Sequence, residues 1–122
     1  MMYSVMLVDN EPIIPKGLMK LIDWRSCDCQ ISAVARDGID AVRQIREQAP
    51  DILITDIRMP EMDGFEVLTL MSKNDWIERI PVITISSETA SAYIDHAYDL
   101  GATDYISRPF DEKTVQRRVR NT

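Results

Sequence analysis

Side chains that can bind metal ions or phosphoryl groups follow four of the five short apolar segments of this 122-residue chain. They are Asp9 and Asn10 after the first segment, Asp56 after the third, Ser86 after the fourth and Arg108 after the fifth. Carboxylates bind hard divalent cations, and a cation with a basic side chain neutralises phosphoryl oxygens. An aspartate after a strand, taken alone, is typical of a turn or a helix cap. The combination favours phosphoryl chemistry.

The five apolar segments predict strands buried on both faces of a parallel sheet, because they are rich in Val and Ile and do not alternate with polar residues. The segments between them carry apolar residues at helical spacing. Pro12, Gly64 and Gly101 mark helix ends. Five strand–helix units require right-handed crossovers and helices on both faces. The predicted strands include residues 5–8, 31–35, 52–54, 82–85 and 105–106.

The position of these polar residues predicts a single pocket. In open parallel sheets, ligands bind beyond the carboxyl ends of the strands, where the strand order reverses. Side chains that follow separate strands therefore converge there.

Length, composition and charge limit the class of protein. The chain is long enough for one domain, with 45% hydrophobic and 28% charged residues, which is the balance of a folded globular protein. It has neither the roughly 20 apolar residues of a membrane span nor a signal peptide, so we expect a cytoplasmic protein without membrane contact. The net charge of -6 argues against direct binding to nucleic acid. The last predicted helix lacks a stop signal, which suggests that residues 1–122 are one domain of a longer chain.

Four sequence motifs stand out: residues 7–12, residues 55–64, Ser86 and residues 105–110. Together they resemble the receiver domain of bacterial two-component response regulators. The similarity covers essentially the whole chain in the right order, and its most specific part runs from Asp56 to Gly64. It implies a flavodoxin-like α/β fold, a (βα)5 three-layer sandwich around a doubly wound parallel sheet in the order 2-1-3-4-5.

The resemblance implies that Asp56 is the phosphoacceptor, which attacks the phosphohistidine of a sensor histidine kinase. It also implies a magnesium site formed by Asp9, the side chain of Asn10, Asp56 and the backbone carbonyl of Arg58. The protein would then be a phosphoacceptor switch rather than an enzyme, with self-catalysed phosphoryl transfer as its only chemistry.

The same resemblance implies how the domain switches. Ser86 would bond to a phosphoryl oxygen, Arg108 would pair with the phosphoaspartate, and Tyr105 would move inward as Ser86 moves. The peptide bond between Arg108 and Pro109 would be cis. Phosphorylation adds about -1.5 to -2 units of charge, which would alter the surface formed by the fourth helix, the fifth strand and the fifth helix.

That surface is expected to contact an output domain of the same parent chain or a second copy of the domain in a homodimer. The segment 21–24 and the motifs around Asp9 and Asp56 look most like regulators whose receiver precedes an AraC-type helix-turn-helix domain. The resemblance thus suggests a transcriptional role for the parent protein, whose output domain is absent from these residues.

Two residues depart from the family pattern, which has an acidic residue at position 10 and a lysine at position 108. Asn10 removes one negative charge from the predicted metal site, although its amide oxygen still coordinates. Arg108 keeps the charge on a larger planar group, which can pair with Asp56 or Asp9 without phosphate. Both changes predict weaker magnesium binding or a distorted response.

One other function fits this pattern, and two further functions fit it poorly. The departures at positions 10 and 108 favour a phosphorylation-independent pseudo-receiver, an interaction module with the same fold. A magnesium-dependent aspartyl phosphohydrolase needs a second aspartate two residues after the nucleophile, where this chain has Arg58. A flavin carrier needs a hydroxyl- or glycine-rich loop after the first strand, which is absent.

Overall fold

Parallel strands form the central sheet of the computed structural model, which describes residues 2–59, 61–86, 91–108 and 110–122. The sheet has five strands within these ranges, in the order β2-β1-β3-β4-β5, and each neighbouring pair is parallel. This confirms the predicted flavodoxin-like α/β fold. The strands are β1 (Tyr3–Val8), β2 (Cys29–Ala35), β3 (Ile52–Asp56), β4 (Val82–Ser86) and β5 (Asp104–Ser107).

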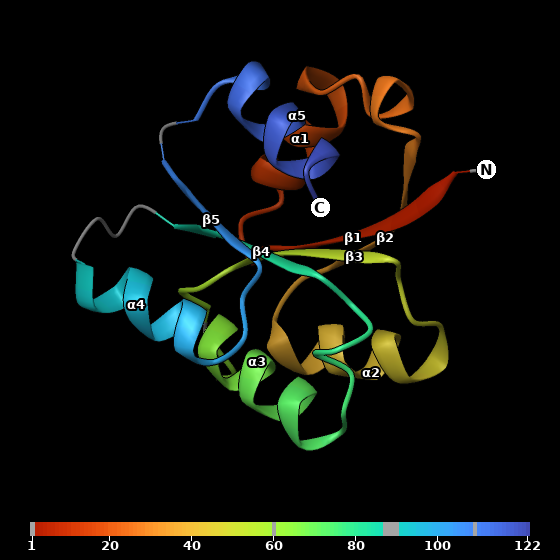
Figure 1. Ribbon diagram of the computed structural model, residues 1–122. Helices are drawn as coiled ribbons and strands as arrows, with labels where there is room; N and C mark the ends of the chain where they lie inside the picture. The colour runs from red at the N-terminus through yellow and green to blue at the C-terminus, as the bar shows by residue number, and fades with distance from the viewer. Residues whose placement is uncertain (1, 60, 87–90, 109) are drawn as a thin grey trace.

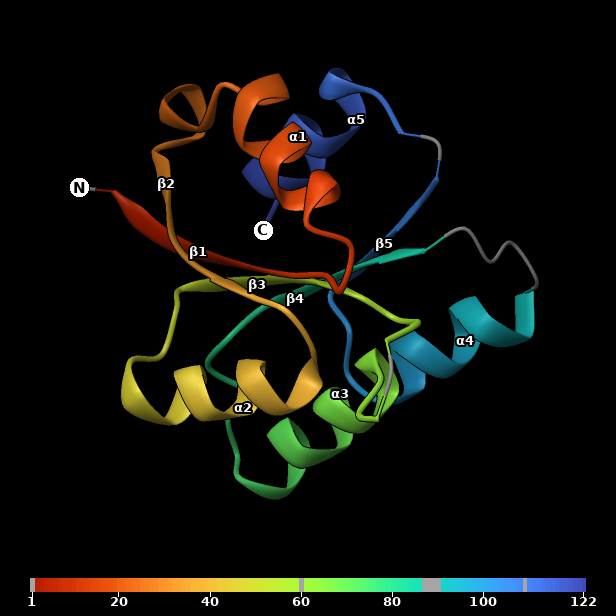
Figure 2. The ribbon, with the colours of Figure 1, turned by 180° about the vertical axis from the view of Figure 1, so that it is seen from behind.

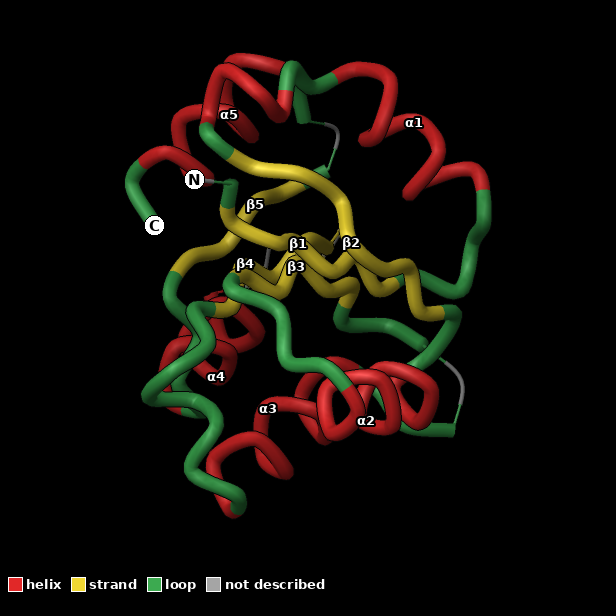
Figure 3. The backbone as a smooth tube through the Cα atoms, turned by 90° about the vertical axis from the view of Figure 1, so that its right-hand side faces the viewer, coloured by secondary structure: helices red, strands yellow, loops and turns green. Residues whose placement is uncertain are grey.

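Helices cover both faces of the sheet and complete three layers (Figure 1). α1 and α5 lie on one face, while α2, α3 and α4 lie on the other, as the view from behind also shows (Figure 2). The sheet is seen between the two helical layers in Figure 3. The helices are α1 (Ile13–Leu21), α2 (Gly38–Glu47), α3 (Gly64–Lys73), α4 (Ser91–Asp99) and α5 (Glu112–Arg120).

Aspartate caps define where three of the helices begin. The side chains of Asp37, Asp63 and Asp111 each accept a hydrogen bond from the backbone N–H three residues ahead, at the starts of α2, α3 and α5. Such caps satisfy a free N–H of the first helical turn. A short 3₁₀ helix at Trp24–Cys27 was not predicted from the sequence; Asp23 caps it in the same way.

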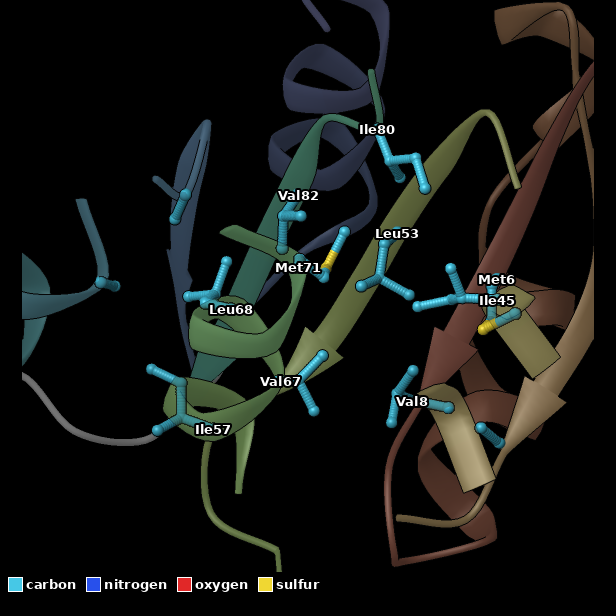
Figure 4. Packing of buried hydrophobic residues seen from close by; sticks show 14 of the residues in the cluster. Met6, Val8, Ile45, Leu53, Ile57, Val67, Leu68, Met71, Ile80 and Val82 are labelled. Atoms are coloured by element: carbon cyan, nitrogen blue, oxygen red, sulfur yellow. The ribbon is translucent and has the colours of Figure 1, made fainter. Parts of the chain in front are cut away.

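The hydrophobic core lies in two clusters, one on each face of the sheet. Val5 and Leu7 of β1 pack beneath α1 and α5, whereas Met6 and Val8 pack against α2 and α3 on the opposite face. Figure 4 shows the latter cluster, where Leu53, Met71 and the side chains around them lie between strand and helix. This two-sided burial is the physical reason for the uninterrupted apolar segments.

The edge strand β2 departs from the prediction of burial on both faces. Its residues alternate between buried and more exposed positions, and Val34 is 41% exposed. The prediction holds for β3 and β4, whose residues are all buried. An edge strand has a neighbouring strand on one side only, so more of its residues are exposed. The amino-acid composition of the segment did not reveal this exposure.

Candidate functional site

Asp9 and Asp56 lie at the carboxyl ends of two neighbouring strands. β1 and β3 pair in parallel with Val8 opposite Thr55, so the two aspartates that follow emerge next to each other. Both are only 6% exposed. Buried carboxylates are rare without a compensating charge, so this pair forms a site rather than two separate surface turns.

Arg108 provides a compensating charge inside the pocket. Its Nη2 donates to Oδ2 of Asp9 at 2.5 Å and lies 3.8 Å from Oδ1 of Asp56. The expected pairing of Arg108 with a site carboxylate in the absence of phosphate is therefore present, and the closer partner is Asp9. The buried Nε of Arg108 has no hydrogen-bond acceptor among the described residues.

Backbone hydrogen bonds hold the two sides of this pocket in place. The backbone N–H of Glu11 donates to Oδ1 of Asp9 at 2.9 Å, so both oxygens of this carboxylate are engaged. On the other side, the backbone N–H of Arg108 donates to the carbonyl of Ser86 at 2.9 Å. Ser86 ends β4 and is 1% exposed. Four predicted site residues thus come together at one edge of the sheet, from β1, β3, β4 and β5.

A glycine lets α3 begin directly against the end of β3. A Cβ atom on Gly64 would lie 2.6 Å from the backbone oxygen of Asp56 and 2.8 Å from Cα of Ile57. Nearby, the hydroxyl of Thr55 donates to the same backbone oxygen of Asp56 at 2.9 Å. Thr55 was not singled out from the sequence, since a threonine within a strand is ordinary.

The carboxyl group of Asp56 lies in an environment that disfavours its negative charge. Burial raises its pKa to about 6, and the charge of Asp9 adds to this rise. Arg108 and the backbone N–H groups of Ile57 and Arg58 oppose it in part. Additional positive charge beside Asp56 would therefore stabilise the ionised form that a nucleophile requires.

The donor atoms at this site are of the type that binds a hard divalent cation. Two neighbouring carboxylates repel each other, which a cation between them would relieve. Asn10 is exposed and adds no charge. Within the described parts of the chain, no group of three His, Cys, Asp or Glu side chains is arranged to hold a metal ion. A cation would therefore depend on two carboxylates, one of which is already paired with Arg108.

Tyr105 occupies a buried position in β5. It lies opposite Thr84 of β4, is 6% exposed, and belongs to the core cluster beneath α2 and α3. Its ring is therefore directed inward in this structure. The predicted cis bond before Pro109 lies outside the described residues.

The chain belongs to the response regulator receiver domain family, because the model of that family matches residues 5–120. The site described above is therefore that of a receiver domain. Receiver domains work with histidine kinases and output domains, and they generally bind Mg²⁺ at the phosphorylation site.

Known proteins with similar sequence or structure agree with this assignment. The transcriptional regulatory protein HptR of Staphylococcus aureus is 30% identical, over 94% of this chain and 44% of its own. The REC domain of AraT, a response regulator from Geobacillus stearothermophilus, is 27% identical with a TM-score of 0.85, covering 99% of this chain and 95% of that one. A chain of the CheX–CheY–BeF₃–Mg²⁺ complex from Borrelia burgdorferi is 29% identical with a TM-score of 0.87, covering 98% and 87%.

The chain spans about half the length of the curated relatives it matches. None of the helices in the described ranges combines the length and the apolar character needed to cross a membrane.

Proposed function

We propose that Asp56 accepts a phosphoryl group from the phosphohistidine of a sensor histidine kinase. A carboxylate oxygen of Asp56 attacks phosphorus, the bond from phosphorus to the histidine nitrogen breaks, and that nitrogen keeps the electron pair. The observation that carries this proposal is the convergence of Asp9, Asp56 and Arg108, linked at 2.5 and 3.8 Å, with Ser86 beside them. The transfer is self-catalysed, and no other activity is proposed for the domain.

Magnesium would be held by Asp9, Asp56 and the backbone carbonyl of Arg58, with the amide oxygen of Asn10 as a weaker ligand. When bound, the ion supplies positive charge that neutralises phosphoryl oxygens. The presence of both Mg²⁺ and BeF₃ in the CheX–CheY complex, one chain of which resembles this one, supports magnesium binding. Weak binding is expected because Arg108 holds Asp9 and because Asn10 is uncharged.

Arg108 and Ser86 would hold the transferred group. The buried Nε of Arg108, which lacks an acceptor among the described residues, offers a donor for a phosphoryl oxygen. Ser86 contributes its hydroxyl to another oxygen. Tyr105 acts as the switch residue that responds to this rearrangement. It lies in β5 directly opposite Thr84, which precedes Ser86 by two residues in β4.

We further propose a cytoplasmic location and an output domain in the parent chain, of the AraC-type DNA-binding class. The partial coverage of longer relatives and the transcriptional role in the name of HptR support an output domain with a transcriptional role. The face formed by α4, β5 and α5 would contact that domain or a second copy. DNA contact is assigned to the output domain, since this domain has a net charge of -6.

A phosphorylation-independent pseudo-receiver is the second candidate function. The ion pair between Arg108 and Asp9 favours it, because an internal cation already occupies the carboxylate that a metal ion would use. In that case Arg108 would stay paired with Asp9, and the domain would act only by binding partners at its surface.

Binding of beryllium fluoride, a mimic of the phosphoryl group, separates these two functions. Fluorine NMR of the domain with BeF₃⁻ and excess Mg²⁺ should show bound fluorine resonances that are absent from the Asp56→Asn variant. A wild-type spectrum with free fluoride species alone would favour the pseudo-receiver. Arg118→Gln, which changes a surface arginine paired with Asp104 at 2.9 Å, should bind like the wild type.

Replacing Asn10 by aspartate should tighten Mg²⁺ binding about tenfold, because a third carboxylate adds a unit of negative charge within a few ångströms of the ion. An NMR titration of the backbone amides around Asp9 measures the dissociation constant. Glu11→Gln provides a neighbouring control and should leave the affinity almost unchanged, since the backbone of Glu11, rather than its exposed side chain, contacts Asp9. Equal affinity in the wild type and Asn10→Asp would place position 10 outside the metal site.

A further inference from the structure

The side chain of Arg58 joins the loop after β3 to the first turn of α4. Its Nη2 donates to the hydroxyl of Tyr93 at 3.2 Å, and its guanidinium carbon lies 5.7 Å from the centre of the Tyr93 ring. A hydrogen bond and a cation–π contact thus act between the same two residues. Nothing in the sequence pattern predicted this pair, which is separated by 35 positions.

The backbone of Arg58 belongs to the phosphorylation site. Its N–H helps to offset the charge of Asp56, and its carbonyl is a proposed ligand of magnesium. The residues on either side, Ile57 and Met59, are 1% and 8% exposed, and the carbonyl of Ile57 accepts a hydrogen bond from Gly64 at 2.8 Å. A change at the pocket therefore acts on a short, anchored segment whose exposed side chain reaches α4.

α4 buries few of its own side chains, which favours movement of this helix. Ala97 is its one buried residue in the described structure, whereas α2 and α3 each bury four. Elements with few buried contacts are the ones that move at low free-energy cost.

Tyr93 also belongs to an aromatic cluster formed by α3 and α4. The rings of Tyr93 and Phe65 are 5.7 Å apart, and Phe65 meets His96 edge to face at 4.5 Å. Tyr93 therefore contacts both the loop that carries Arg58 and the first turn of α3. A displacement of Arg58 would be transmitted to the start of α4 through this ring.

We propose that Arg58 is a positioning residue that couples occupancy of the Asp56 pocket to the position of α4 through its contact with Tyr93. This inference rests on the proposed function, because it needs a pocket that binds a phosphoryl group or its mimic. It adds a connection that is separate from Ser86 and Tyr105, which act through β4 and β5. This connection is short, because the backbone of Arg58 lies at the pocket and its own side chain contacts α4.

Hydrogen exchange of α4 tests the proposal, with Mg²⁺ and saturating BeF₃⁻ as the probe. The wild type should show a change in exchange across residues 91–99 on binding. Arg58→Gln and Tyr93→Phe should lose most of that change, although BeF₃⁻ still binds, because the backbone carbonyl remains in place. In the empty state, Arg58→Gln should raise exchange in α4 roughly two- to fivefold.

Two variants serve as matched controls. Tyr98→Phe removes a hydrogen bond of 3.3 Å to Asp104 at the other end of α4 and should keep the wild-type response. Arg58→Lys retains a cation over the Tyr93 ring and should restore part of the response.

The outcomes distinguish this inference from the proposed function. If the wild type responds and Arg58→Gln and Tyr93→Phe respond equally, the coupling role is wrong while the phosphoacceptor proposal stands. If the wild type binds no BeF₃⁻, the proposed function fails and the coupling role fails with it.

Discussion

Replacing Asp56 by asparagine is expected to stabilise the metal-free domain by about 2–3 kcal/mol at neutral pH. Burial and the charge of Asp9 raise the pKa of this carboxyl from 3.8 to about 6, so the folded state holds an ionised group that it disfavours. Asparagine has a similar shape and no charge, and Arg108 keeps its closer partner Asp9. The gain measures how much stability the domain loses by burying an ionised carboxylate at position 56.

The pH dependence of this effect has a definite sign. Well below pH 3.8 the carboxyl is neutral in both states and the variant should have little advantage. As the pH rises toward about 6, the unfolded state ionises while the folded state keeps its proton, so the stability of the wild type falls relative to the variant. Above that pH the difference should be constant.

Urea unfolding in the presence of a metal chelator, at several values of pH, measures the difference in free energy of unfolding. Asp95→Asn, at an exposed position of α4, is the control and should change the stability little at any pH. An Asp56→Asn variant less stable than the wild type at neutral pH would mean that Asp56 is well compensated in its pocket.

The second large effect is expected at Arg108. Changing it to glutamine should tighten Mg²⁺ binding about ten- to a hundredfold, because it removes a positive charge bound to Asp9 and 3.8 Å from Asp56. Two unit charges about 4 Å apart interact by roughly 4 kcal/mol at an effective dielectric constant near 20, and a fraction of this accounts for the change.

Calorimetric titration with MgCl₂ gives the dissociation constants of the wild type and the variants. Arg108→Lys retains the positive charge and should show a smaller gain than Arg108→Gln. Arg118→Gln removes a charge elsewhere on the surface and should leave the affinity unchanged. Weaker Mg²⁺ binding in Arg108→Gln would show that Arg108 supports the metal site instead of competing with it.

Local sequence patterns predicted the five strands because burial on both faces of a parallel sheet requires uninterrupted apolar segments. The segment from Val5 to Val8 is apolar throughout because its residues pack alternately into two cores. The strand order came from the family resemblance, since periodicity carries no information on which strands are neighbours. The alternating burial of β2 was missed because the composition of a strand does not show how far neighbouring elements cover it.

The site was predictable to the extent that strand ends meet at one edge of the sheet. That rule brought Asp9, Asp56, Ser86 and Arg108 together correctly. The sequence left open whether Arg108 would pair with Asp9 or Asp56, because the choice depends on how far the side chain reaches across the pocket. The contact between Arg58 and Tyr93 joins a loop and a helix that are 35 positions apart in the chain. It could not be predicted from the sequence because it depends on where α4 packs.

Mass spectrometry after treatment with a small phosphodonor tests the central claim most directly, with wild type and Asp56→Asn each measured with and without Mg²⁺. We predict that the wild type gains the mass of one phosphoryl group in the presence of Mg²⁺, that peptide mapping assigns it to Asp56, and that the variant gains none. A wild type that stays unmodified at high Mg²⁺, or a phosphoryl group mapped to another residue, would contradict the role assigned to Asp56.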